Sequence, residues 1–129
     1  MISNFGQSPN GLLQIDVQCR GLVRLTDATR DADQLLWARA QLTDHWATEA
    51  QSAESQAFAD ALGQCLRDNE LLSTLYPEPL LDQANWVVAR WLELAPIANH
   101  YKVLFYPADS YANAVTLLAE ILLTKSSAQ

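Results

Sequence analysis

The chain has 129 residues, of which 50% are hydrophobic and 18% are charged, so its composition is that of a globular protein and not of a disordered one. Fifteen acidic side chains oppose eight basic ones, and the net charge of −7 argues against a nucleic-acid-binding protein and against docking on anionic lipid. The length predicts one globular domain over residues 12–125, with a loose arm over residues 1–11 and a tail over 126–129.

Targeting and membrane-spanning signals are absent from the sequence. The first residues show no basic region followed by an apolar core, and no stretch reaches the roughly 18 apolar residues of a membrane helix. The two cysteines, Cys19 and Cys65, are too few for the disulfide framework of a small secreted protein. We therefore expect a cytoplasmic protein with no membrane partner.

The first regular signal is an alternation of apolar and polar residues over residues 12–26. Leu13, Ile15 and Val17 alternate with polar neighbours, and the pattern resumes after Gly21, which marks a bend or a break. Helical spacing also fits part of this segment. The β-branched residues favour a strand with one buried face.

Four later segments carry the apolar spacing of amphipathic helices. They cover residues 30–48, 53–68, 79–95 and 111–124. Pro79 suits the first position of the third helix, and Leu71–Leu75 adds a further turn after the second.

Residues 101–106 (Tyr-Lys-Val-Leu-Phe-Tyr) are rich in strand-forming residues and end at Pro107. The predicted fold is therefore α+β and helix-dominated, with about four amphipathic helices and a small sheet built from residues 12–26 and 101–106. The alternative is an all-α bundle in which residues 12–25 are also helical.

The acidic side chains are concentrated in one part of the chain. Residues 27–82 hold eleven acids and three bases, while the remaining residues hold four acids and five bases. One interpretation is that these acids keep solvated helix faces soluble. The other is a surface that steers a basic partner protein, to which Asp31, Asp33 and Asp44 would belong.

Trp86 falls on the charged face of the predicted helix 79–95, because Asp82, Arg90 and Glu93 recur with it at helical spacing. Three interpretations remain open. The helix is covered on both sides, or the N-terminal arm folds over it, or Trp86 anchors a partner protein beside Arg90.

For Trp37 too, the sequence leaves open whether the side chain is covered within the chain or anchors a partner, because polar residues lie four positions before and after it. The candidate partner-binding residues are therefore Trp86, Arg90, Trp37, Asp31, Asp33 and Asp44.

No set of residues in the sequence indicates a catalytic, metal-binding or cofactor-binding site. The histidines, His45 and His100, have no partner at a meaningful spacing, and the sequence lacks the motifs of zinc, calcium and phosphate sites. We predict no catalytic residue, no metal ligand and no cofactor, and an enzyme is the less favoured class.

The leading hypothesis is a small acidic protein–protein interaction module. Its size, acidity and helix content are typical of bacterial immunity proteins and of secretion chaperones, a similarity of profile and not of motif. The partner would be another protein, basic in the first case, or a second copy that pairs along a free strand edge.

Two alternative functions remain. One is a small-molecule binder or enzyme whose pocket is lined by His100, Tyr101, Tyr106 and Asp109. The other is a structural subunit of a larger complex.

Overall fold

A computed structural model describes residues 1–123 of the chain. The chain divides into two compact units, Met1–Asp44 and His45–Gln129. We call the first the β unit and the second the helical unit, and each is described by itself. The predicted tail over 126–129, and residues 124 and 125 of the predicted helix and domain, lie outside the described residues.

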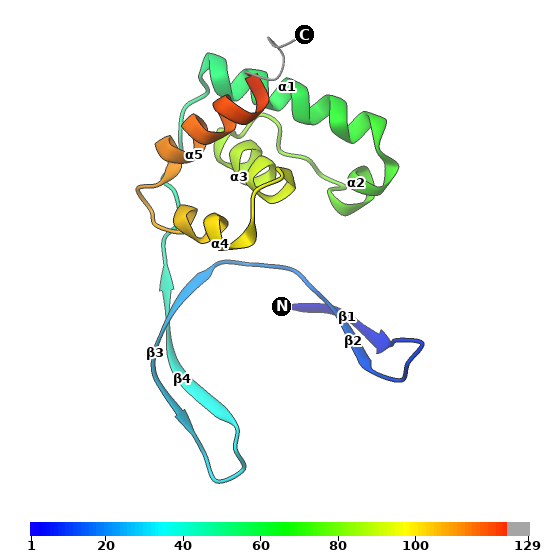
Figure 1. The fold of residues 1–129 in the computed structure, drawn as a ribbon, viewed down its shortest axis with the longest axis vertical. Helices are drawn as coiled ribbons and strands as arrows, with labels where there is room; N and C mark the ends of the chain where they lie inside the picture. The colour runs from blue at the N-terminus through cyan, green and yellow to red at the C-terminus, as the bar shows by residue number, and fades with distance from the viewer. Residues whose placement is uncertain (124–129) are drawn as a thin grey trace. The chain divides into compact units, whose positions relative to one another are not determined.

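The β unit consists of two antiparallel hairpins (Figure 1). Its strands are β1 (Ile2–Gln7), β2 (Leu13–Val17), β3 (Leu22–Arg30) and β4 (Leu36–Thr43). β1 pairs with β2, and β3 pairs with β4. Gly11, with φ 83°, lies in the turn between β1 and β2, in a conformation that glycine adopts without strain. The alternation predicted over residues 12–26 is therefore confirmed as strand.

Two sequence-based expectations are corrected in this unit. Residues 2–7, expected within a loose arm, form β1, because β2 supplies the hydrogen-bonding edge that they need. Residues 30–48, expected as a helix, contain the end of β3 and all of β4. The turn between these two strands holds Gln34 at φ 65°, which is incompatible with a continuous right-handed helix.

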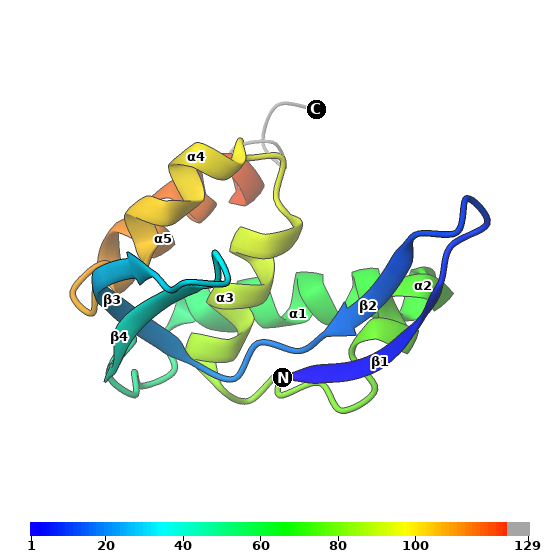
Figure 2. The ribbon, with the colours of Figure 1, turned by 90° about the horizontal axis from the view of Figure 1, so that it is seen from below.

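The helical unit begins with an irregular segment and continues through short helices. These are α1 (Ala53–Asp68), α2 (Glu70–Leu75), α3 (Ala84–Leu94), α4 (Asn99–Lys102), the 3-10 turn η1 (Val103–Phe105), α5 (Tyr111–Leu118) and the π-helical turn η2 (Ala119–Leu123). α3 packs against both α1 and α5 (Figure 2). The helix predicted over 53–68 and the extra turn at 71–75 are confirmed.

Within residues 1–123, every member of the buried core lies in the helical unit. The largest contributions come from Trp46, Phe58, Leu62, Val87, Val88, Trp91, Leu92, Phe105 and Leu118. The Trp91 indole Nε1 donates a hydrogen bond of 2.9 Å to the Phe58 carbonyl, and the Trp46 Nε1 donates one of the same length to Ser110 Oγ. These bonds satisfy the polar atoms of the two buried indoles.

Two further expectations are wrong in the helical unit. The strand over 101–106 is replaced by α4 and η1, because the helical turn carries Phe105 into the core, where its side chain is 8% exposed. α3 begins at Ala84 and not at Pro79. Gln83, the residue before the helix, has an extended backbone (φ −106°, ψ 109°), so the helix does not continue back to Pro79.

The architecture is thus a mixture of helices and two-stranded antiparallel sheets, which fits the α+β class. The strands exclude the all-α alternative, and the predicted sheet between residues 12–26 and 101–106 does not form. Among the described residues, no helix is both long enough and apolar enough to cross a membrane.

Candidate functional site

The first hairpin has one apolar face, which follows from its register. Phe5 lies opposite Ile15, and Ile2 lies opposite Val17, so these pairs point to the same side. Leu13 joins them, because alternate residues of β2 share a face. The five side chains are between 46% and 76% exposed. The hairpin therefore carries the pattern of a half-buried sheet on a face that nothing in its own unit buries.

The second hairpin repeats this arrangement. Val23 lies opposite Leu42, Leu25 lies opposite Ala40, and Leu36 shares their face through the alternation of β4. The four large side chains of this face are between 51% and 80% exposed. The opposite face is polar: it carries Arg24 opposite Gln41 and Thr26 opposite Arg39. We call these two surfaces the apolar faces: Ile2, Phe5, Leu13, Ile15 and Val17 on the first hairpin, and Val23, Leu25, Leu36 and Leu42 on the second.

The β3–β4 turn gathers three of the predicted site residues. Asp31 accepts hydrogen bonds from the backbone amides of Asp33 (2.9 Å) and Leu35 (3.0 Å) and from the Trp37 indole Nε1 (2.8 Å). The bond from Trp37, followed by the one from Leu35, lowers the pKa of the Asp31 carboxyl below its ordinary value. Trp37 is 61% exposed on the polar side of β4. Asp44, the last residue of the β unit, is exposed.

Trp86 and Arg90 lie in a different setting, on α3 of the helical unit. The ring of Trp86 meets that of Tyr76 edge-on at 6.0 Å, and the Arg90 guanidinium carbon lies 5.5 Å from the Trp86 ring and 5.6 Å from the Tyr76 ring. Trp86 is half-buried, so Tyr76 and Arg90 cover part of it. This arrangement supports the first interpretation of Trp86, in which the charged face is itself covered.

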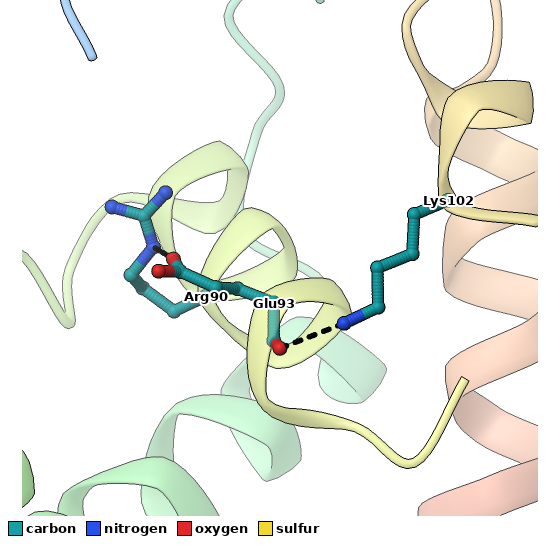
Figure 3. Close-up of polar contacts among 3 residues, drawn as sticks. All are labelled: Arg90, Glu93 and Lys102. Carbon is teal, nitrogen blue, oxygen red and sulfur yellow. Dashed lines mark hydrogen bonds and ion pairs between the residues drawn. The ribbon is translucent and has the colours of Figure 1, made fainter. Parts of the chain in front are cut away.

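Glu93 contacts both Arg90 and Lys102. Its carboxylate lies 3.1 Å from Arg90 Nε, and its backbone carbonyl accepts a hydrogen bond of 2.9 Å from the Lys102 ammonium of α4 (Figure 3). Burial, together with a hydrogen bond to Glu93, raises the pKa of Tyr76. The polar contacts thus link α3 to α4 on one side of the helical unit.

A groove of about 490 Å³ opens beside this cluster. Its walls include the apolar side chains of Trp46, Leu92 and Phe105. Arg90 and Lys102 contribute positive charge to it, and Glu93, paired with Arg90, contributes negative charge. Its volume falls in the range of about 300–1,000 Å³ that is usual for small-molecule sites. Of the four residues of the pocket predicted from the sequence, Tyr106 lines this groove, whereas His100, Tyr101 and Asp109 do not.

The predicted site residues therefore belong to two separate groups. Asp31, Asp33 and Trp37 meet at the β3–β4 turn, whereas Trp86 and Arg90 belong to the helical unit. The apolar faces of the hairpins were missed as a surface. The signal was present in the alternation of residues 13–25, but it was interpreted as a buried face and not as an exposed one.

The described part of the chain has neither a cluster of metal ligands nor a disulfide. Within residues 1–123, no group of three or more His, Cys, Asp or Glu side chains is placed to hold a metal ion. Both cysteines are free thiols: Cys65 packs against the core, whereas Cys19 is exposed between β2 and β3.

Comparison with protein-family models, with curated proteins and with solved structures finds no match for this chain. Its function is therefore argued from its own residues, and the exposed apolar faces are the feature that most needs an explanation.

Proposed function

We propose that this chain is a protein-binding module and that it binds through the apolar faces of its two hairpins. The observation that carries the proposal is the exposure of all nine large apolar side chains on these faces, between 46% and 80%. Scattered apolar residues on a surface are ordinary, but a contiguous set on one face of a strand pair is typical of an interaction surface.

The stability of the hairpins supports the same conclusion. A two-stranded hairpin is marginally stable in water unless a further strand or a helix covers its apolar face. Among residues 1–123, the strands of each hairpin pair only with each other, so the outer edges of the hairpins offer backbone donors and acceptors to a further strand. A bound polypeptide would both cover the faces and pair with these edges.

The candidate anchors predicted from the sequence contribute at the margin of this surface. Trp37 is exposed on the second hairpin, and Asp31 and Asp33 stand at its turn. These acids would affect the rate of encounter with a basic partner, whereas the apolar faces would supply the affinity. Trp86 and Arg90 remain predictions as partner contacts, because part of their surface is already used within the helical unit.

The test is a tagged pull-down with matched variants of neighbouring residues. Leu25→Asp places a charge on the apolar face, and Gln41→Asp places the same charge on the polar face of the same hairpin. We expect the wild type and Gln41→Asp to capture the same protein and to retain it at high salt, because apolar contact is insensitive to screening. Capture by Leu25→Asp should be lost. Equal capture by all three proteins would overturn the proposal.

The groove beside Arg90 supports a second candidate, the binding of a small anionic molecule with an apolar body. Two of the three described basic side chains of the helical unit, Arg90 and Lys102, line this groove, while Arg67 does not. A thermal-shift measurement with benzoate and indole-3-acetate tests this candidate. We expect stabilisation that Lys102→Gln removes, whereas the absence of a shift with either compound counts against it.

A further inference from the structure

We infer that the polypeptide covering the apolar faces is a second copy of this chain, so that the β unit is a homodimer interface. This inference rests on the proposed function and names its partner. Three properties of the β unit support it: the apolar area, the charge and the free strand edges.

The apolar area matches one side of a dimer interface. Burying a large apolar side chain that is about half exposed removes on the order of 60 Å² from water, so the nine side chains supply on the order of 500 Å². A standard interface buries about 800 Å² on each partner, of which somewhat more than half is apolar. The two hairpins therefore supply the apolar part of one such interface without the helical unit.

The distribution of charge along the chain favours the β unit over the helical unit as the dimer interface. Residues 1–44 carry five acids and four bases, a net charge of −1, whereas residues 45–129 carry ten acids and four bases, a net charge of −6. Two copies that met through their helical units would bring like charges together, which opposes association. Two copies that met through their β units would meet almost no such repulsion.

The composition of the apolar faces also suits a two-fold interface. In a two-fold dimer the same patch serves both subunits, so the patch must complement itself. The nine side chains are all apolar, and no acid shares their faces by register, although Arg30 lies opposite Leu36 at the turn end of the second hairpin. Asp27, at the bulge of the second hairpin, lies 3.5 Å from Arg39 on the polar side and not on the apolar face.

The free edges of the hairpins can form backbone hydrogen bonds between the two copies, which contact between apolar side chains does not provide. Each strand is hydrogen-bonded on one side only, so an antiparallel strand of a second copy can extend either sheet. Such pairing sets the register of the dimer, whereas the apolar contact supplies most of its stability.

The experiment measures the mass of the full chain in solution by sedimentation velocity over a wide range of concentration. Two apolar-face variants, Leu25→Asp and Ile15→Asp, are compared with their neighbours on the polar faces, Gln41→Asp and Gln14→Asp. We expect a wild-type dimer whose dissociation constant rises about 30-fold or more in the two apolar-face variants. The polar-face variants should remain dimeric. None of the four residues belongs to the core, so circular dichroism of the helices checks only the helical unit of each variant. The dispersion of the hairpin amide signals by NMR checks that the β unit of each variant is folded.

Three other results would overturn the inference. A dimer that persists in Leu25→Asp and Ile15→Asp would place the interface elsewhere. A monomer that binds an apolar dye, with the dye signal reduced by the same two variants, would mean that a different protein covers the faces, and the proposed function would stand. A monomer that binds no dye and whose hairpin amides resist hydrogen exchange would mean that the chain covers its own faces, and both proposals would fail.

Discussion

Asp31 shows how much one side chain contributes to a hairpin that has little apolar burial. Its carboxylate accepts three hydrogen bonds across the β3–β4 turn, from two backbone amides and from the Trp37 indole. Only the ionised form accepts all three, so the fold favours the carboxylate and lowers its pKa. The stability that this group contributes to the turn is therefore present above the pKa of an unfolded aspartate, about 3.9, and is lost as the pH falls through the lower folded pKa.

Trp37→Phe should raise the pKa of Asp31 toward its ordinary value, because the bond from the indole is the largest cause of the shift. Titration of the Asp31 side-chain carboxyl by NMR measures this pKa directly. Leu36→Ala, which alters the neighbouring residue on the opposite face, should leave the pKa unchanged. An unaltered pKa in Trp37→Phe would show that the backbone amides alone set it.

At the scale of elements, α1 and α2 formed where they were expected, and both carry capping signals at their starts. α1 begins with a reciprocal pair: Ser52 Oγ accepts from the Ser55 amide at 3.1 Å, and Ser55 Oγ accepts from the Ser52 amide at 2.8 Å. Asn69 ends this helix and caps α2, since its side-chain oxygen accepts from the amides of Leu71 and Leu72. These contacts are local, so the sequence around them is enough to specify where the helices start.

Ser52→Ala should lower the free energy of unfolding by about 1 kcal/mol, because it leaves an amide of the first turn of α1 without its side-chain acceptor. Chemical denaturation followed by circular dichroism measures the change. Ser73→Ala is the matched control, since that hydroxyl donates only to the Glu70 carbonyl on an exposed side of α2. Its effect should stay within about 0.5 kcal/mol. Equal losses in both variants would contradict the capping role.

At the scale of the whole molecule, the two units differ in what stabilises them. All described core residues lie between Trp46 and Leu118, whereas the β unit has none. Hydrophobic burial, which is the dominant favourable contribution to folding, therefore acts almost entirely within the helical unit. Under the proposal made above, the β unit would gain comparable burial when a polypeptide covers its apolar faces.

A chain consisting of residues 45–129 should therefore fold without the β unit. We expect helical circular dichroism and one cooperative thermal transition, because the fragment retains the whole described core. A fragment of residues 1–44 should show no cooperative transition at low concentration, since isolated hairpins are marginal. A non-cooperative transition in the longer fragment would show that its core depends on the β unit.

The errors of sequence-based prediction in this chain share one cause. Residues 36–43 are mostly helix formers, yet they form β4 because β3 offers a paired edge across the chain. Residues 101–106 are mostly strand formers, yet they turn helically, and this turn places Phe105 in the core, where its side chain is 8% exposed. In the first segment the preceding strand of the same hairpin overrides the local preference, and in the second segment the core does. Neither contact can be read from the residues of the segment alone.

The candidate site, like the fold, could be predicted from the sequence only in part. The alternation of Leu13, Ile15 and Val17 correctly indicated an apolar face on a strand, since that pattern depends only on neighbouring residues. That this face is exposed, and that residues 2–7 pair beside it, depends on which segments meet in space. The sequence by itself thus determined the mixed fold class, the charge distribution and the helices with local caps. Only the tertiary structure decided the strand pairing and the separation into two units, because both follow from contacts between residues far apart in the chain.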